Sequence, residues 1–553
     1  MLNRIYYSTI YVLLCLVMVG CSGDTNGSVD MKANDRDSTT VLTMYSEDLK
    51  MEYDSFLSPV AKAITKESGI VLDIEYPTEG ISEKMDLLIA SNVYPDLIMV
   101  KDTHKFVDAN AYIDLRPLIE AYGPNIKKLY DGYMNRLQFS NEDNSIYVLP
   151  QRPVDEIAWE PEMGFQLQHA VVKALGYPKL ETLDDYENAI RSYINMFPEI
   201  NGEPTIGISF VIDDWRWKIS LGNAAGFATG APDDGNWYVD PVTFETSYRF
   251  LREEEKEYYR WLNHMYNDGL IDPESFVQKY ESYVAKIASG RVLGLIDAKW
   301  QYAFAETILR ENNMEERMYG QYPVQLDKST KAADFRDVGY IGGYGIGISK
   351  DCEDPIAAIK FLDFMASDEG HILRLWGIEG EHFYYENGKR VIPPEEMEKR
   401  LTDADYFKNT GKSVYGYPFP IWGRGKLDES NNYYNPDSQE ILMANYTEIE
   451  KEVMAAYDVN TWAELYPTAD ELPVSLWGEA WDIPIPTGSS IRFQLQECDE
   501  IMREGLIRTV LSKPDEFDEN WEDIMEQLDR ANVHLMGNEF TKLVKARIEL
   551  WRE

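Results

Sequence analysis

The chain has 553 residues, with 53 Lys and Arg against 96 Asp and Glu and a formal net charge of −43. A field of that sign repels nucleic acid and anionic lipid, so we exclude polyanion binding as a general function and expect no nucleic-acid partner. A single anionic group held by a local arginine is not excluded, because pairing at contact distance outweighs a screened long-range field.

The first twenty residues have the pattern of an export signal. Arg4 is the only charge before an apolar run over residues 10–20, which is too short to cross a bilayer as a stable helix. The run leads through small residues to Cys21, an arrangement that resembles the lipobox at which bacterial lipoproteins are cleaved and acylated. We predict a lipoprotein signal peptide over residues 1–20 and lipidation of Cys21, which would anchor the chain to the membrane. The alternative is an unmodified Cys21 thiol after an ordinary cleavage site.

Residues 21–39 are rich in Ser, Thr, Asn, Asp and Gly and have little apolar surface to bury. Such a segment cannot offset its own ordering entropy, so we predict a flexible tether. The residues that follow are too many for one hydrophobic core, and we expect at least two lobes.

Strand and helix patterns alternate from residue 40. Apolar runs at residues 40–45, 70–76 and 95–100 are typical of strands, and helical patterns separate them. This alternation predicts a parallel sheet with helices on its faces. Ligands of such sheets lie beyond the carboxyl ends of the strands, so the loop that starts at Lys101 is a candidate edge of the site.

The middle of the chain adds further elements. We predict helices over residues 161–175, 183–196 and 253–268, and the apolar spacing of the last one places Trp261 in the core. Residues 291–296 are typical of a buried strand, and residues 338–349 of a strand rich in glycine. Asp354 and Pro355 then supply the N-cap and first position of another helix.

We find no convincing motif for phosphate, dinucleotide, zinc or nucleophilic chemistry in the sequence. Residues 233–236, with Asp240 beyond them, lack the alternating oxygen ligands of a calcium loop and are interpreted as a turn. We therefore predict no cofactor, no metal and no catalytic residue. Paired carboxylates for glycoside cleavage remain the alternative, because their separation is spatial and the sequence does not show it.

Two cysteines, Cys352 and Cys498, remain after the signal and the lipidation site. A disulfide between them is an option outside the cell. We favour two buried free thiols, because the two residues fall in segments that we assign to different lobes.

Aromatic residues make up 13% of the chain, with 37 Tyr and 13 Trp. Flat apolar faces with a polar handle suit sugar rings, whose C–H groups stack while their hydroxyls seek donors and acceptors. The number of tryptophans favours several subsites, and so oligomers over monosaccharides.

Several motifs follow one another along the chain. They are Pro95-Asp96-Leu97-Ile98, residues 293–300 ending in Lys299-Trp300, residues 354–364 beginning with Asp354-Pro355, Ser367-Asp368-Glu369-Gly370, and Trp376-Gly377-Ile378-Glu379-Gly380. Together with the lipobox they resemble the family 1 extracellular solute-binding proteins, in particular the long lipoproteins found beside carbohydrate importers.

The resemblance implies an α/β fold of the two-lobed, periplasmic-binding-protein-like type II, with a hinge between two mixed α/β lobes. The N-terminal lobe would comprise residues 40–150 and 326–385, and the C-terminal lobe residues 151–325 and 386–553. The chain would cross between them near residues 150–153, 322–325 and 381–394. A ligand that contacts both lobes shifts the equilibrium toward the closed form.

The resemblance also implies a function. We expect a monomeric, lipid-anchored receptor on the extracellular face of the bacterial membrane. It would capture oligosaccharides in an aromatic-lined cleft between the lobes and deliver them to the permease subunits of an ABC transporter, with no catalysis. The alternatives are a secreted glycan-active enzyme on a two-lobed scaffold and a sensor that signals without import.

The family pattern also points to ligand-binding residues. Trp300 matches an aromatic that stacks on sugar, with a core position as its alternative, and Lys101, Asp102 and Thr103 match polar contacts, with a solvated loop as theirs. Trp215, Arg216 and Trp217 bracket a guanidinium with two rings, which suits a polar ring. The other expected ligand-binding residues are Gln151 and Arg152 in the first crossover, Trp159 after it, Tyr344 between glycines, Trp422, Arg424 and Trp481.

Overall fold

The computed structural model describes residues 39–47, 56–77 and 81–552, and the chain from Thr39 onward forms one compact unit. The predicted signal peptide, the predicted lipidation site Cys21 and the tether up to residue 38 lie outside the described residues. Across the described part of the chain, no helix is both long and apolar enough to cross a membrane.

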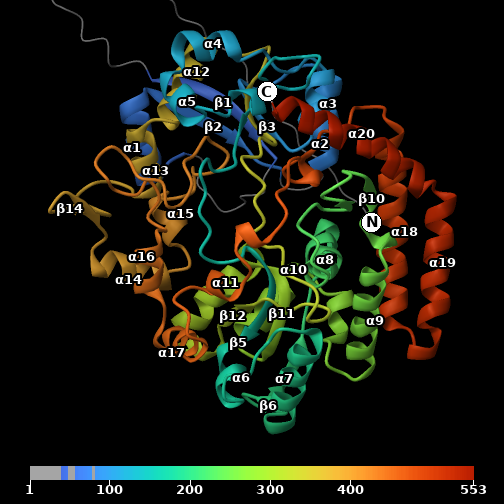
Figure 1. Ribbon diagram of the computed structural model, residues 1–553. Coiled ribbons are helices and arrows are strands. Elements are labelled where there is room, and N and C mark those ends of the chain that lie inside the picture. The colour runs from blue at the N-terminus through green and yellow to red at the C-terminus, as the bar shows by residue number, and fades with distance from the viewer. Residues whose placement is uncertain (1–38, 48–55, 78–80, 553) are drawn as a thin grey trace, which may run out of the picture. The chain divides into compact units, whose positions relative to one another are not determined.

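A five-stranded sheet is built from the first part of the chain and one later strand (Figure 1). Its order is β2-β1-β3-β13-β4; β1 is parallel to β2 and β3, whereas β13 is antiparallel to β3 and β4. The strands are β1 (Thr40–Ser46), β2 (Ile70–Glu75), β3 (Leu97–Val100), β4 (Leu149–Pro150) and β13 (Gly345–Ile348). The parallel arrangement of the first three strands confirms the prediction.

Helices surround this sheet and complete its core. They are α1 (Pro59–Ser68), α2 (Ile81–Ser91), α3 (Thr103–Asp108), α4 (Arg116–Tyr122), α5 (Pro124–Leu129), α12 (Pro355–Met365) and α13 (Asp368–Leu375). α12 begins at the predicted cap, where the Asp354 side chain accepts a hydrogen bond from the Ala357 N–H and Pro355 takes the first position. It packs against α4, α5 and α13, which lie around it in Figure 1.

A second sheet has the order β12-β5-β11-β8, with β5 antiparallel to both β12 and β11 and with β8 parallel to β11. Its strands are β5 (Met163–Gln168), β8 (Ile206–Ile208), β11 (Val292–Ala298) and β12 (Tyr319–Tyr322). Every residue of β11 is buried, as predicted for this strand. The helices around this sheet are α6 (His169–Ala174), α7 (Leu183–Met196), α8 (Ala224–Ala228), α9 (Glu253–Asn267), α10 (Tyr280–Ala288) and α11 (Lys299–Glu311).

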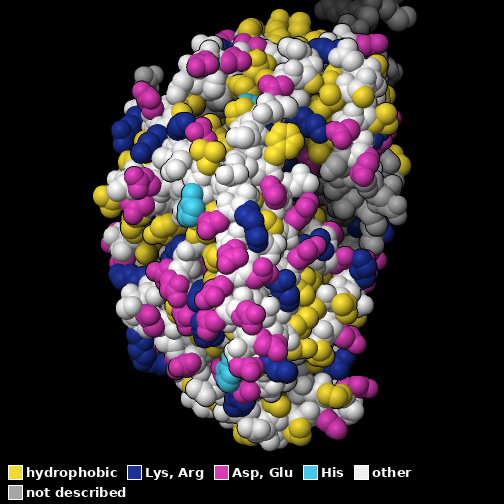
Figure 2. Space-filling view, turned by 90° about the vertical axis from the view of Figure 1, so that its right-hand side faces the viewer, with side chains coloured by type: hydrophobic (Ala, Val, Ile, Leu, Met, Phe, Trp, Pro, Cys, Tyr) yellow, Lys and Arg dark blue, Asp and Glu magenta, His cyan; other side chains and the backbone are white. Residues whose placement is uncertain are grey.

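The remaining elements are two-stranded ribbons and later helices. The ribbons pair β6 (Glu199–Ile200) with β7 (Glu203–Pro204), β9 (Trp237–Val239) with β10 (Thr246–Tyr248), and β14 (Tyr384–Glu386) with β15 (Lys389–Val391). The helices are α14 (Pro394–Thr402), α15 (Tyr406–Thr410), α16 (Gln439–Asn445), α17 (Glu448–Tyr457), α18 (Ser490–Leu511), α19 (Phe517–Arg530) and α20 (Val533–Trp551). On the face drawn in Figure 2, Asp and Glu side chains are spread widely among Lys and Arg, in keeping with the net charge of −43.

The helix predicted over residues 161–175 is wrong for its first half. Met163–Gln168 form β5, and only His169–Ala174 are helical. β5 pairs on both edges, with β11 and with β12, so partners distant in the sequence decide its conformation over the local pattern. The glycine-rich strand predicted at 338–349 is likewise shorter, because only Gly345–Ile348 find strand partners.

Each sheet has its own large hydrophobic core. Cys352 lies in the core of the first sheet and Cys498 in that of the second; both are buried and free, as predicted. Beyond the third expected crossing, Tyr434 packs in the first core and Tyr446 in the second. The lobe boundaries and the crossings remain a prediction.

Candidate functional site

A large cleft opens among the loops of the two sheets. Its volume is about 3400 Å³, and it is lined by Lys101 and Tyr344 next to the first sheet and by Trp215 and Trp300 next to the second. Typical pockets for drug-sized ligands measure roughly 300–1,000 Å³. The cleft therefore has room for a ligand longer than one small ring.

Two tryptophans form a bare aromatic surface on one wall of the cleft. The rings of Trp215 and Trp300 stack with centroids 5.9 Å apart and planes inclined by 24°. The two side chains are 44% and 54% exposed, which is unusual for such large apolar groups. About half of each side chain is therefore available to a flat, partly apolar partner.

The helix α11 explains why Trp300 faces the cleft. It begins directly after β11, and its buried face carries Tyr302, Ala305 and Leu309. Trp300 and Phe304 fall one turn apart on another face, and Phe304 is 52% exposed and also lines the cleft. The wall is thus longer than the tryptophan pair alone.

Cationic side chains border the aromatic surface. The Arg216 guanidinium lies 5.0 Å from the ring of Trp215 and 4.4 Å from that of Tyr280, and the Lys101 Nζ lies 6.0 Å from the Trp215 ring. Arg216 and Trp215 belong to one short 3-10 turn, Asp214–Arg216. Trp217 is instead buried in the second core and only borders the cleft.

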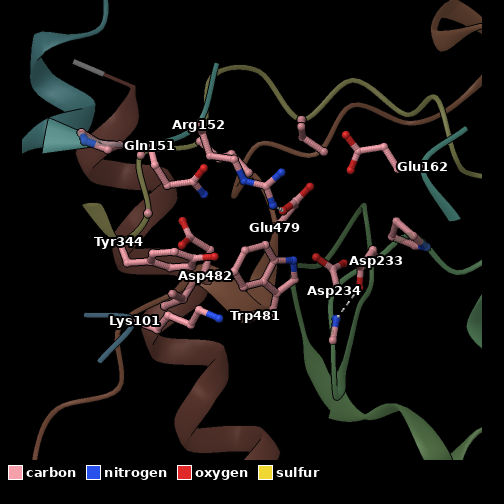
Figure 3. Close-up of a pocket in the computed structure, with 18 of the residues that line it drawn as sticks. Lys101, Gln151, Arg152, Glu162, Asp233, Asp234, Tyr344, Glu479, Trp481 and Asp482 are labelled. Atoms are coloured by element: carbon pink, nitrogen blue, oxygen red, sulfur yellow. Dashed lines mark hydrogen bonds and ion pairs between the residues drawn. The ribbon is translucent and has the colours of Figure 1, made fainter. Parts of the chain in front are cut away.

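A second part of the cleft combines a ring with an ion pair (Figure 3). Arg152 pairs with Glu479 at 2.9 Å and lies 5.1 Å above the ring of Trp481. Tyr344 is next to that ring, with centroids 6.4 Å apart. Gln151 donates its backbone N–H to the Tyr344 carbonyl at 3.4 Å. This arrangement offers a flat face with hydrogen-bonding groups at its edge.

Burial raises the pKa of Glu479 to about 8, and the nearby carboxylates Asp233, Asp482 and Asp234 act in the same direction while Arg152 opposes them. The folded protein therefore holds a proton on this group that the unfolded chain releases near its ordinary pKa of 4.5.

The free energy of unfolding is expected to fall as pH rises from about 4.5 to about 8. In this range the unfolded chain has released the proton of Glu479, whereas the folded protein still binds it. A difference of one between the folded and unfolded pKa of a group corresponds to about 1.4 kcal/mol. The variant Glu479→Gln keeps a neutral side chain at every pH and should lose part of this slope. Urea denaturation at a series of pH values measures the effect; identical slopes in both proteins would contradict it.

An ion pair joins the surroundings of the two sheets. Asp102 caps α3, directly after β3, and receives Arg492 of α18 in a bidentate pair at 2.5 and 2.8 Å. Burial opposes ionisation of Asp102, but the hydrogen bonds and charge of Arg492 leave its pKa lowered. Since α18 packs in the second core, this pair connects the two sides of the cleft.

Removing this pair with Arg492→Met is expected to widen the average separation of the two sides in the ligand-free protein, because one direct link between them is lost. Small-angle scattering should show a larger radius of gyration than for the unmodified protein. Arg508→Met is the control, because it breaks a pair between α18 and α19 on the same side of the cleft. Equal radii for all three proteins would contradict the expectation.

The structure brings most of the predicted site residues to the cleft. Those that line it are Lys101, Asp102, Thr103, Gln151, Arg152, Trp215, Arg216, Trp217, Trp300, Tyr344 and Trp481. Trp159, Trp422 and Arg424 are not among the lining residues. Trp422 is 6% exposed and stacks on Tyr434 in the first core, and Arg424 pairs with Glu156.

Sequence reasoning missed several lining residues. Phe304 could have been found from its position four residues after Trp300 in a helical pattern. Glu479, Asp334 and Arg492 could not, because they come from segments far from the recognised motifs and reach the cleft only through the fold.

One cluster in the described residues has the composition of a metal site. Glu187, His264 and Asp268 place ligand atoms within 4.8 Å of one another. Arg191 already pairs with both carboxylates at 2.6 Å, and none of the three lines the cleft. The cluster is accounted for as an ion-pair network.

The protein has two mixed sheets, each covered by helices and each with its own core, and a large aromatic-walled cleft lies between their loops. This arrangement defines a two-lobed binding protein. The chain belongs to the bacterial extracellular solute-binding protein family, whose sequence model matches residues 60–375, more than half of its length. Members of this family are transport receptors, so the chain is a binding protein and not an enzyme.

One curated relative is the fructooligosaccharide ABC transporter substrate-binding protein FusA of Streptococcus pneumoniae, which is 25% identical over 249 residues. The match covers 41% of this chain and 44% of that protein.

Solved structures resemble almost the whole chain. FusA of Streptococcus pneumoniae in complex with kestose has a TM-score of 0.64 and 16% identity, with 93% of this chain and 99% of that chain covered. An HMO-binding ABC-transporter-associated solute-binding protein of Bifidobacterium longum infantis has a TM-score of 0.65 and 12% identity, with coverage of 92% and 99%. The alginate-binding protein AlgQ2 without calcium ion has a TM-score of 0.64 and 16% identity, with coverage of 94% and 99%. These likenesses confirm the predicted two-lobed fold.

Proposed function

We propose that this protein captures oligosaccharides in the cleft and delivers them to the permease subunits of an ABC transporter. The observation that carries the proposal is the exposed, stacked pair Trp215 and Trp300 in a cleft of about 3400 Å³. Indole faces stack on the C–H faces of sugar rings, and a long cleft accommodates several rings in a row. FusA, named for fructooligosaccharides, supports the ligand class.

Within this proposal, the side chains of the cleft have distinct roles. The exposed pair Trp215 and Trp300 offers one aromatic surface for sugar rings, and Trp481 with Tyr344 offers a second flat surface. Charged and amide groups at the edges of these rings bind hydroxyls; they are Lys101, Arg216, Gln151, Arg152 and Glu479.

Calorimetry and tryptophan fluorescence with a set of oligosaccharides test the proposal. The probes are kestose, nystose, maltotetraose, cellotetraose and xylotetraose, and each sample is analysed for products after the titration. We expect saturable binding of at least one probe, with no product formed. Binding of none would overturn the proposal, and shorter products would favour a glycan-active enzyme.

We further propose that a lipid on Cys21 holds the protein at the extracellular face of the bacterial membrane. The support is the sequence before Cys21, which matches a signal with a lipobox. Labelled palmitate should be incorporated into the expressed full-length chain, and Cys21→Ser should abolish the label and release the protein into the medium. A labelled Cys21→Ser chain would contradict this proposal.

A further inference from the structure

The arginines of the cleft are largely engaged by carboxylates. Six of them lie at ion-pair distance from acidic side chains: Arg152 from Glu479 at 2.9 Å, Arg216 from Asp214 at 2.6 Å, Arg336 from Asp234 at 3.4 Å, Arg492 from Asp102 at 2.5 Å, Arg547 from Asp482 at 3.4 Å, and Arg400 from Asp437. A guanidinium that already holds a carboxylate would have to give up that bond to hold a carboxylate of a ligand. These six residues therefore do not form a site for an acidic sugar.

Asp334 pairs with no arginine or lysine in the part of the chain that the structure describes. It lines the cleft, and no cationic side chain of the described residues contributes to its ionisation. Burial raises the pKa of Asp334 to about 7, opposed only by a hydrogen bond from its own backbone N–H. Its carboxyl group is thus open to hydrogen bonds that a ligand can supply.

A small polar space lies beside this carboxyl group. Gly164, in β5, has a φ of +135°, a conformation that strongly favours glycine. Apart from adjacent chain atoms, a Cβ built on Gly164 would have two atoms of the described residues within 4 Å, the Asp334 Oδ1 at 3.6 Å and the Tyr466 hydroxyl oxygen at 3.9 Å. The space beside Gly164 is therefore bordered by two oxygens.

The Tyr466 hydroxyl also has no hydrogen-bond partner among the described residues, although the side chain is only 6% exposed. A buried hydroxyl without a partner costs free energy in the unliganded protein. Its ring packs 5.5 Å from that of Phe335, which lines the cleft. Gly164 and Tyr466 lie behind the residues that line the cleft, and Asp334 lines it. A ligand group that passes Asp334 into the space beside Gly164 could bond to both Tyr466 and Asp334.

We propose that Gly164, Asp334 and Tyr466 form a subsite for a hydrogen-bond-donating group of the bound oligosaccharide, either a sugar hydroxyl or a protonated sugar amine. The proposal rests on the oligosaccharide-binding function proposed above and narrows its ligand class to neutral or amino sugars. A uronate at this subsite would place its carboxylate against Asp334.

Other carboxylates near the cleft also disfavour an acidic sugar. Figure 3 shows Asp233, Glu162 and Glu479 around another part of the cleft, and the acidic side chains in Figure 2 belong to a chain with a net charge of −43. This field disfavours the approach of an anionic ligand at longer range.

The test compares Tyr466→Phe and Asp334→Asn with the unmodified protein by calorimetry. The probes are the neutral set above, a glucosamine tetramer and a galacturonate tetramer. We expect both variants to bind the best neutral or amino probe roughly 5- to 100-fold more weakly. We expect the galacturonate tetramer to bind the unmodified protein most weakly of all the probes.

A matched variant separates this role from a structural one. The Tyr457 hydroxyl donates to the Pro178 carbonyl at 2.8 Å, away from the cleft. Tyr457→Phe should lower the melting temperature and leave the affinity unchanged. Tyr466→Phe should instead weaken the affinity and leave the melting temperature unchanged or higher. The melting temperature should not fall, because the lost hydroxyl has no partner among the described residues of the free protein.

Several outcomes overturn the subsite. If Tyr466→Phe and Asp334→Asn bind the best probe as tightly as the unmodified protein, the subsite is wrong while the oligosaccharide function stands. Preferred binding of the galacturonate tetramer also overturns it. If the unmodified protein binds none of the probes, the proposed function fails and the subsite with it.

Discussion

Replacing both Trp215 and Trp300 by alanine is expected to weaken oligosaccharide binding by roughly 100-fold or more, while the protein stays folded. A stacked aromatic anchor contributes roughly 1–3 kcal/mol to affinity, and this pair provides two. Both side chains are about half exposed, so their truncation removes little buried apolar surface from the core. Calorimetry with the tightest-binding probe and thermal unfolding of each variant measure the two effects.

The two single variants complete a double-mutant cycle. Because the rings of Trp215 and Trp300 contact each other, their effects should not be additive. Tyr385→Ala is the control, since Tyr385 is 44% exposed, like Trp215, but lies outside the cleft. Equal losses of affinity for the control and the double variant would show that the aromatic pair does not bind the sugar.

The sequence predicted the parts of the fold whose local pattern and tertiary environment agree. The helix α7 and the buried strand β11 appear close to their expected bounds, because their apolar spacing matches the surfaces that they bury. β5 was mistaken for a helix because its two partner strands, β11 and β12, lie more than 100 residues further along the chain. No local pattern reports such pairing.

The candidate site shows the same contrast between residues that a local motif identifies and residues that only the fold identifies. Trp300 follows a family motif at the end of a strand, and it lines the cleft. Trp422, on an irregular segment without such a motif, lies in the first core. Asp334 and Tyr466 were missed because what singles them out is the lack of a partner. That property depends on every neighbour in three dimensions.

Replacing Arg374 by methionine is expected to destabilise the protein by several kcal/mol, because each buried acceptor that loses its donor costs roughly 1–3 kcal/mol. The side chain is fully buried in α13, yet it is charged. Its guanidinium donates to five backbone carbonyls, those of Gly370 (3.3 Å), Tyr415 (2.9 Å), Gly416 (3.3 Å), Met365 (2.6 Å) and Pro420 (2.8 Å). Methionine fills much of the same volume but donates to none of these acceptors, so each of them loses a buried hydrogen bond.

The loss should be one of stability and not of binding, because Arg374 does not line the cleft. Urea denaturation is expected to show a lower midpoint for Arg374→Met, while the folded fraction binds its probe with unchanged affinity. Arg508→Met gives the scale for an exposed arginine, since its pair with Asp523 lies at the surface and should contribute less than about 1 kcal/mol. Equal midpoints for the two variants would mean that the carbonyls around Arg374 find other donors, and that this arginine does not hold the segment around residues 415–420 against α13.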